Sequence, residues 1–541
     1  MNFLDVKLLQ DLEINNNLIP SIDNTITSYG KIKFRELLNI IYFDEKPLMR
    51  RKEIIKTIIQ NPKNTKKIIR ELHSIKKYEK NINWLFDCQK KELNDLYFQK
   101  DFFNSTDLLS TKNFLKIYAP SLLILVYLFI YVILKYCGIS IDIKQYFYGI
   151  YKSTYFIIMG TLSLIMNNIC LISFLTNMLA TLYILYQLYS VYNSVDSSIS
   201  HYNKCHDFNK HIDNIRNVVD SIKKIYKLDK FFFSEKNLIL QYIKEIDDVF
   251  DESKLHKFGY KLITKKNNKD YELSFNKALQ YIGLVDSFIN IAKLVTKYNF
   301  IFPTFDFNKN MGPYIKTTGL WCPYIDQFKQ VKNYCYLGNE KPNNIILTGP
   351  NTSGKSTYIR NTMIAILLAQ TIGVTCADSL TVTPFSYLFT YLDIPNVYRD
   401  KESLFEAEVL RCMEYCKVIE NMDKNQFTFT IMDELFTGTN PKEGIAASYS
   451  VVEYLGNFNN NLNIITTHFM ELTDLEKQYP DKFKNMRFHI IKGKDNSFFR
   501  SYMIEEGASE QHIAIELLKQ KGYNNIIINK ALQKLKELNE S

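Results

Sequence analysis

The pattern of apolar and polar positions divides the chain into a helical part and a mixed part. Up to about residue 300, apolar residues recur at helical spacing and Gly and Pro are scarce, which predicts long helices over roughly 45–118 and 190–298. Beyond it, short runs rich in β-branched and aromatic residues alternate with helical segments. These runs are Ile345–Thr348, Thr428–Met432, Asn463–Thr466, Arg487–Ile491 and Arg500–Ile504. Because alternating strands and helices pack as layers, the pattern predicts a C-terminal α/β domain preceded by an all-α domain.

Two apolar stretches interrupt the helical part. Residues 117–134 and 153–195 contain no charged side chain. A helix that crosses a bilayer needs about 20 apolar residues, and tyrosines gather at the edges of both stretches as they do at membrane surfaces. We therefore expect a transmembrane helical hairpin with spans at about 119–137 and 160–185; a pair of buried core helices is the alternative. Asn167-Asn168 interrupts the second stretch, which leaves three spans as an alternative to two.

The distribution of charge suggests a class of partner. The formal net charge is +10, and residues 46–116 contain 17 Lys and Arg against 8 Asp and Glu. Such a basic block favours a polyanionic partner, DNA or anionic lipid, although lysines that alternate with acids can also form a solvated helical face. Nine cysteines without a C-x-x-C pair, and a polar start without a signal-peptide pattern, predict reduced thiols in a cytosol-facing protein.

The segment TGPNTSGKST, residues 348–357, matches the phosphate-binding pattern G-x-x-x-x-G-K-[ST]. It follows the apolar run Ile345–Leu347 and precedes an apolar helical segment, Tyr358–Gln370, which is the strand–loop–helix context that the motif requires. Backbone N–H groups can then surround phosphate oxygens, Lys355 can neutralise the β- and γ-phosphates, and the Ser356 hydroxyl can hold Mg²⁺. The predicted nucleotide-binding residues are Gly349, Pro350, Asn351, Thr352, Ser353, Gly354, Lys355, Ser356 and Thr357.

Two later runs end in side chains suited to ATP hydrolysis. Residues 427–432 lead into Asp433 and Glu434, about 80 residues after the phosphate loop. We expect Asp433 to order the Mg²⁺ shell and Glu434 to orient and deprotonate the attacking water. A further strand ends at His468, where a histidine can sense the γ-phosphate. The predicted catalytic residues are therefore Glu434, His468 and Lys355.

These motifs together resemble the ATPase domain of the MutS mismatch-repair family, an ABC-like P-loop fold. The resemblance rests on GPNTSGKSTYIR, IMDELFTGTNPKEG and ITTHFMELTDLE. It implies ATP and Mg²⁺ as ligands and a homodimer with composite sites, in which the signature residues Ser403 and Glu408 act across the interface. Tyr336, in a segment similar to the F-x-x-N element, is implied to stack on adenine. Residues 507–518 are similar to the helix–turn–helix region near the dimer contact.

Three departures from the family pattern change the expected function. We expect the mismatch-reading and connector domains to be absent, because the chain starts at the helical core. Phe436-Thr437 replaces the usual G-R, as in a divergent branch predicted to hold membrane helices. The apolar pair lies where the family has its DNA clamp, at the tips of two long lever helices.

The expected organisation follows from these features. The predicted domains are a helical core and first lever half at 1–118, a transmembrane hairpin at 119–190, a second lever half at 191–300 and a MutS-like ATPase domain with C-terminal helices at 301–541. We expect a multi-pass membrane protein whose ATPase domain faces the cytosol and which binds DNA in an ATP-dependent manner, as in mismatch repair. The alternatives are a membrane-embedded mechanochemical ATPase without a DNA mismatch role, contacting lipid through the hairpin, and a degenerate ATPase that serves as a scaffold.

Overall fold

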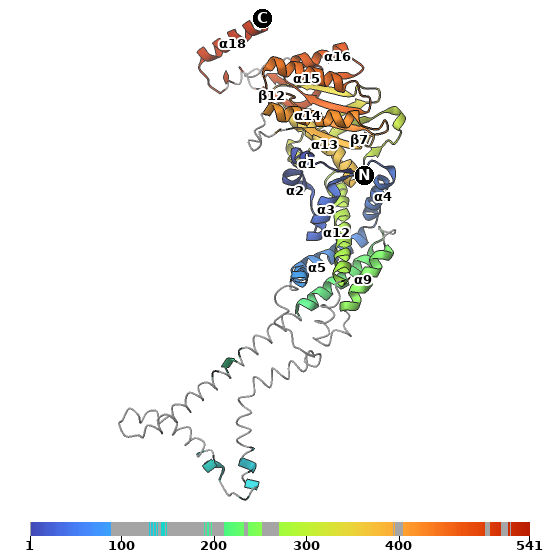
Figure 1. The fold of residues 1–541 in the computed structure, drawn as a ribbon, viewed down its shortest axis with the longest axis vertical. Coiled ribbons are helices and arrows are strands. Elements are labelled where there is room, and N and C mark those ends of the chain that lie inside the picture. Colours follow the sequence, from blue (N-terminus) through green and yellow to red (C-terminus); the bar gives the residue numbers. More distant parts are fainter. Residues whose placement is uncertain are drawn as a thin grey trace, which may run out of the picture. The chain divides into compact units, whose positions relative to one another are not determined.

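The computed structural model describes residues 2–87, 210–231, 236–250, 270–392, 404–492, 498–509 and 521–540, with single residues or short pieces between them. The chain divides into two compact units (Figure 1). The first contains residues 1–73, 228–234 and 279–541, and the second contains residues 74–227 and 235–278. The predicted hairpin lies outside the described residues except for short pieces near 129–148 and Tyr189, and Ser403 and most of 510–520 also lie outside them.

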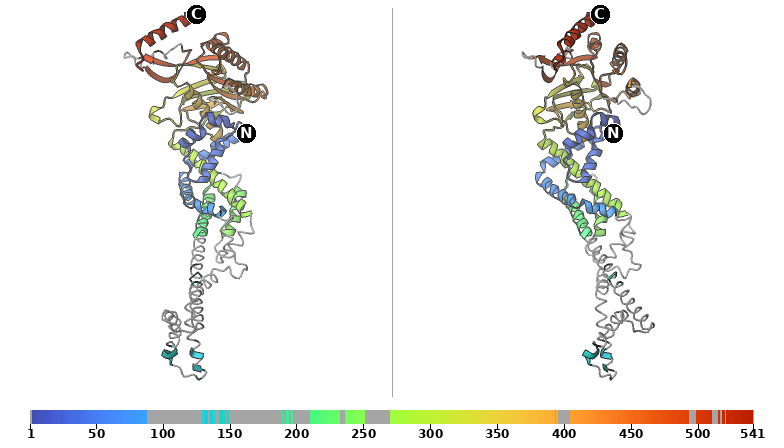
Figure 2. Two further views of the ribbon diagram at one scale, coloured as in Figure 1. Left: turned by 60° about the vertical axis from the view of Figure 1, so that its left-hand side comes forward. Right: turned by 90° about the vertical axis from the view of Figure 1, so that its left-hand side faces the viewer.

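The first unit begins with short helices that pack beside the C-terminal part of a long helix. The elements are β1 (Asn2–Phe3), α1 (Val6–Asp11), a π-helical turn (Ile14–Leu18), α2 (Ile19–Ile22), α3 (Ser28–Leu38), β2 (Ile40–Ile41) and α4 (Glu45–Gln60), with the first part of α5 (Pro62–Asp87) and the last part of α12 (Asp270–Lys297). Thr27 caps α3 by accepting the Gly30 N–H. The fully buried Asp286 of α12 accepts the N–H groups of Ile26 and Thr27 at 3.0 and 2.7 Å, which fixes α3 against α12. Figure 2 shows the N-terminal helices, in blue, beside α12, in green.

A six-stranded sheet forms the centre of the C-terminal domain. Its strand order is β12-β11-β6-β10-β9-β8, and all pairs are parallel except β11–β12. The strands are β6 (Asn344–Thr348), β8 (Tyr387–Tyr391), β9 (Thr428–Asp433), β10 (Asn461–Thr466), β11 (Phe483–Lys492) and β12 (Phe498–Glu506). Five of these overlap the predicted runs, and the α/β alternation expected for this part is present.

Helices cover both faces of this sheet, which explains why its strands are continuous apolar runs. On one face, α14 (Leu404–Glu420), α15 (Pro441–Leu455) and α16 (Asp474–Gln478) bury a cluster that includes Tyr415, Met432 and Ile465 (Figure 1). On the other, α13 (Lys355–Ile372) is buried along almost its whole length. α18 (Asn525–Glu540) ends the described chain.

A second sheet, absent from the sequence prediction, adjoins the first within the same unit. It has four strands in the order β3-β7-β4-β5, formed by Thr304–Phe305, Ser379–Val382, Tyr314–Leu320 and Asn333–Gly338. Three-residue 3₁₀ helices at Lys309–Met311 and Gln327–Lys329 flank β4, and a 3₁₀ helix at Met470–Thr473 precedes α16. The segment between β4 and β5 lines a cavity.

The described residues of the second unit include amphipathic helices. Helix 210–228 buries aliphatic side chains at helical spacing, including Ile215, Ile222 and Ile225. α9 (Lys236–Phe250) buries Ile243 and Ile246. This part of the chain therefore has the helical periodicity that the sequence predicts.

The described residues contain one helix that is long and apolar enough to cross a membrane, Glu272–Lys297. Of its most apolar window, 78% is buried inside the protein, as in the core helix of a globular domain. This helix is not part of the predicted hairpin, which stays a prediction. The cysteines of the described residues (Cys322, Cys335, Cys376, Cys412 and Cys416) are free thiols.

Candidate functional site

The loop between β6 and α13 has the backbone geometry of an anion site. Gly349 and Gly354 have φ angles of 152° and 110°. A Cβ on Gly354 would lie 3.2 Å from the Tyr502 ring, and one on Gly349 would lie 3.0 Å from the Ser353 hydroxyl, so neither position accepts a larger residue without strain. α13 begins at Lys355 rather than at the predicted Tyr358. The N–H groups of its first turn therefore have no helical partner and can bind an anion.

Lys355 is held inside this loop by the loop itself. Its ammonium group donates to the Gly349 carbonyl oxygen at 2.8 Å and lies 3.5 Å from that of Pro350. Burial lowers its pKa below that of an ordinary lysine, and the carboxylates of Glu434 and Asp433 oppose this shift. A cation that is buried against two neutral carbonyls is incompletely neutralised, which is a suitable arrangement for receiving a phosphate.

The parallel strands bring the predicted side chains to the same edge of the sheet. Leu347 of β6 is opposite Thr466 of β10, which is opposite Asp433 of β9, so the residues that follow these positions emerge together. Glu434 is the first residue after β9 and has a left-handed φ of 53°. Its Oε1 atom lies 2.9 Å from Nε2 of His468, and this hydrogen bond lowers the pKa of Glu434 despite partial burial.

His468 links the carboxylate to the lysine through a single nitrogen. Nε2 lies 2.9 Å from Glu434 Oε1 and 3.3 Å from Lys355 Nζ. With a proton on Nε2 the ring donates to Glu434, and without it the same nitrogen accepts from Lys355, so the two bonds are alternatives. The shorter distance favours the bond to Glu434.

Ser356 and Asp433 fit a Mg²⁺ site that phosphate oxygens would complete. Ser356 is in the first turn of α13, and the Asp433 carboxylate accepts the Thr466 hydroxyl, which leaves lone pairs for a cation. No group of three His, Cys, Asp or Glu side chains in the described parts of the chain could hold a metal. Mg²⁺ in nucleotide sites needs only one or two protein oxygens, since phosphates and water supply the rest.

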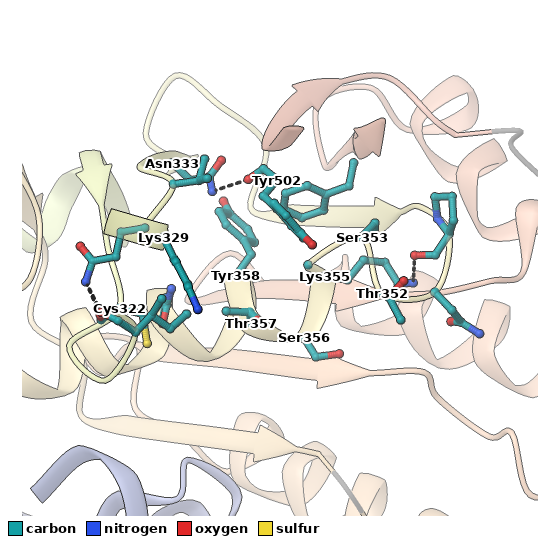
Figure 3. A pocket seen from close by; sticks show the side chains of 18 of the residues that line it. Cys322, Lys329, Asn333, Thr352, Ser353, Lys355, Ser356, Thr357, Tyr358 and Tyr502 are labelled. Carbon is teal, nitrogen blue, oxygen red and sulfur yellow. Dashed lines mark hydrogen bonds between the residues drawn. The ribbon is translucent and has the colours of Figure 1, made fainter. Parts of the chain in front are cut away.

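A cavity of about 570 Å³ extends from the loop and has the size of a small-molecule site. Its lining includes residues 350–358, Glu434, Phe488, Ile325, Val331, Asn333 and Tyr502. In Figure 3, Lys329 and Asn333 lie at the opposite end of the cavity from Thr352 and Ser353. The Asn333 amide donates to the Tyr502 carbonyl oxygen and accepts the Ile504 N–H, both at 2.9 Å, and so holds β12 against β5. The sequence prediction missed these residues, because a lone Asn and a lone Tyr on separate strands carry no motif.

Two predicted site residues lie outside this cavity. Tyr336 is on β5, 38% exposed and packed near Tyr334, and its stacking on adenine stays a prediction. Of β5, the residue that lines the cavity is Asn333. Glu408 of α14 is buried within its own chain, where it accepts the Gly438 N–H, and its role across an interface stays a prediction.

Comparison with known proteins agrees with this geometry. A family model described as MutS domain V matches residues 345–539. The chain is similar to proteins named DNA mismatch repair protein MutS from Staphylococcus epidermidis (26% identity over 57% of this chain and 35% of the relative) and Thermodesulfovibrio yellowstonii (29% over 48% and 30%). The C-terminal part of this chain is a MutS domain V, and the chain is similar to MutS proteins over about half its length. It spans about a third of the length of the curated relatives that it matches.

The MutS domain V match covers most of the cavity. It includes the loop, Glu434, His468 and Tyr502, whereas the wall formed by residues 322–333 precedes it. A helical N-terminal region before this domain agrees with the predicted arrangement.

Proposed function

We propose that this chain binds ATP with Mg²⁺ and hydrolyses it in the cavity beside residues 349–357. The observation that carries the proposal is the meeting, at one edge of a parallel sheet, of an open helix N-terminus, a buried lysine and a hydrogen-bonded Glu–His pair. The MutS domain V match over the same residues supports it.

The chemistry follows from the placement of these groups. The β- and γ-phosphates would bind the loop N–H groups and take over the Lys355 ammonium from the Gly349 carbonyl oxygen. Mg²⁺, held by Ser356 and Asp433, would neutralise phosphate charge. Glu434 would orient a water whose oxygen attacks the γ-phosphorus as the bond to the β-phosphate oxygen breaks, and would receive the water proton. Its lowered pKa keeps it ionised and makes it a weak base, which suits a reaction that depends mainly on positioning.

The far side of the cavity suits a nucleoside. Ile325 and Val331 offer apolar surface, and the Tyr502 side chain is 43% exposed next to Gly354. An aromatic ring and aliphatic side chains are the surfaces on which a base stacks. We propose that Tyr502 contacts the nucleoside, alongside the predicted stacking of Tyr336 on adenine.

A finer proposal concerns DNA, and the basic surface of α5 favours it. Lys63, Lys66, Lys67 and Arg70 are exposed at positions i, i+3, i+4 and i+7 of α5, and therefore on one side of the helix. We propose that this surface contacts the phosphate backbone of DNA, that the protein acts as a membrane-anchored dimer through the apolar hairpin, and that its activity is of the mismatch-repair type. A membrane-embedded mechanochemical ATPase without a DNA mismatch role is the alternative.

Steady-state ATP turnover by the full chain in detergent, with and without mismatched duplex DNA, tests both the ATPase proposal and the DNA proposal. We expect Mg²⁺-dependent hydrolysis that Glu434→Gln abolishes, which supports the ATPase proposal, and stimulation by DNA, which supports the finer one. Turnover that Glu434→Gln leaves unchanged would contradict the ATPase assignment. Glu434-dependent turnover that is indifferent to DNA would favour the alternative.

A further inference from the structure

The turn that follows Glu434 has an unusual backbone and is held by bonds from several elements. Glu434 and Phe436 both have left-handed φ angles, 53° and 55°, which are strained in residues other than glycine. The Glu434 N–H donates to the Thr466 carbonyl oxygen at 3.1 Å, and the Ser448 hydroxyl donates to that of Leu435 at 2.9 Å. Strain of this kind persists where the surroundings enforce it.

Glu408 holds the other end of this turn. Its Oε2 atom accepts the Gly438 N–H at 3.1 Å, and its Oε1 atom accepts the Thr437 hydroxyl at 3.3 Å. A Cβ on Gly438 would lie 3.0 Å from Leu404 Cγ and 3.2 Å from Glu408 Oε2, so the first turns of α14 pack directly on this backbone. Residues 434–438 are thus fixed at one end by β10 and at the other by α14.

Burial of the Glu408 carboxylate at this position is energetically unfavourable. Its side chain is 4% exposed, and no lysine or arginine of the described segments pairs with it; Arg411 of the same helix pairs with Asp5 and Glu414 instead. Burying a carboxylate without a cation destabilises the folded protein unless hydrogen bonds compensate. Glutamine in the same place could make similar bonds without that cost, so stability alone does not explain a charge here.

We propose that Glu408 is a positioning residue for ATP hydrolysis, which fixes the turn at 434–438 so that the Glu434 carboxylate faces His468 and the attacking water. This inference rests on the proposed ATPase function. Because Glu408 sits on α14, whose N-terminus follows the predicted signature serine, the contact also ties the position of that helix to the orientation of Glu434.

The test compares Glu408→Ala and Glu408→Gln with Glu406→Ala, which changes an exposed acid on the same helix. We expect Glu408→Ala to lower kcat at least 10-fold with KM and the Kd for ATP within about twofold of the wild type, because the phosphate loop is untouched. Glu408→Gln should recover part of kcat, since its carbonyl oxygen still accepts the Gly438 N–H. Glu406→Ala should retain wild-type kcat. Unchanged kcat in Glu408→Ala, or a loss that matches lost ATP binding or lost folded protein, would overturn the proposal.

A second measurement separates failure of this inference from failure of the ATPase proposal. A crystal structure of Glu408→Ala should show the turn relaxed and Glu434 Oε1 beyond hydrogen-bond distance of His468 Nε2. If that distance stays near its present 2.9 Å, Glu408 does not position Glu434, whether or not the wild type hydrolyses ATP.

Discussion

Two charged side chains of the candidate site, Lys355 and Glu408, differ in burial from the basic side chains of α5. Lys355 and Glu408 are almost fully buried, and each is held by backbone groups of its own chain. The basic side chains of α5 between 63 and 70 are exposed to solvent. A buried charge is maintained against a large desolvation cost, whereas an exposed one is screened by salt and costs little. The burial of Lys355 and Glu408 therefore indicates a role in chemistry. The exposed basic side chains of α5 instead indicate a long-range, salt-dependent attraction to a polyanion.

The largest expected effect is on ATP affinity when the buried lysine is removed. Lys355→Met keeps the side-chain length but removes the charge that would meet the β- and γ-phosphates. We expect the Kd for ATP, measured by equilibrium dialysis, to rise at least 100-fold, while the free energy of unfolding without nucleotide changes by about 1 kcal/mol or less because a buried charge is also removed. Retained affinity would mean that phosphates bind elsewhere.

A buried acid away from the cavity should matter for stability alone. Asp286→Ala leaves the N–H groups of Ile26 and Thr27 and the Thr27 hydroxyl without their acceptor inside the protein. We expect a loss of about 3 kcal/mol in the free energy of unfolding in urea, with kcat for ATP unchanged in the remaining folded protein. An effect below 1 kcal/mol would show that water replaces the carboxylate.

The basic surface of α5 should affect polyanion binding and not nucleotide binding. Lys63→Glu combined with Lys67→Glu should weaken binding to duplex DNA about 10-fold at low salt and make its dependence on log salt shallower by about 2. The control is Lys530→Glu with Lys536→Glu on the exposed side of α18, which alters net charge equally. An equal loss of DNA binding in both variants would show that net charge alone explains the effect.

The smallest effect is a shift in pH dependence. Because burial lowers the pKa of Lys355, its ammonium group in the free protein loses its proton below the ordinary lysine value. Burying the charged form costs stability below that folded-state pKa, and the cost is relieved as pH rises past it. ATP affinity should accordingly fall at a pH below about 10.5, the ordinary lysine value. A wild-type affinity that is constant up to that pH would contradict this.

Much of the α/β domain could be predicted because its strands are buried on both faces. A strand such as Ile345–Thr348 is recognisable as an apolar run. Residues that follow parallel strands lie at the carboxyl edge of the sheet. The sequence therefore predicts that Lys355, Glu434 and His468 lie close together. Asn333 and Tyr502 could not be predicted, because their contact depends on β12 lying against β5, two strands far apart in the sequence. The side of α14 that Glu408 faces likewise depends on packing rather than on a motif.

The most direct test measures ATP binding and ATP turnover in the same preparations of the full chain. The account predicts that Glu434→Gln binds ATP with a Kd within about threefold of the wild type, yet hydrolyses it at least 100-fold more slowly, because the residue acts on water and not on the loop. If Glu434→Gln turned ATP over at the wild-type rate, the assignment of this cavity as the site of hydrolysis would be wrong.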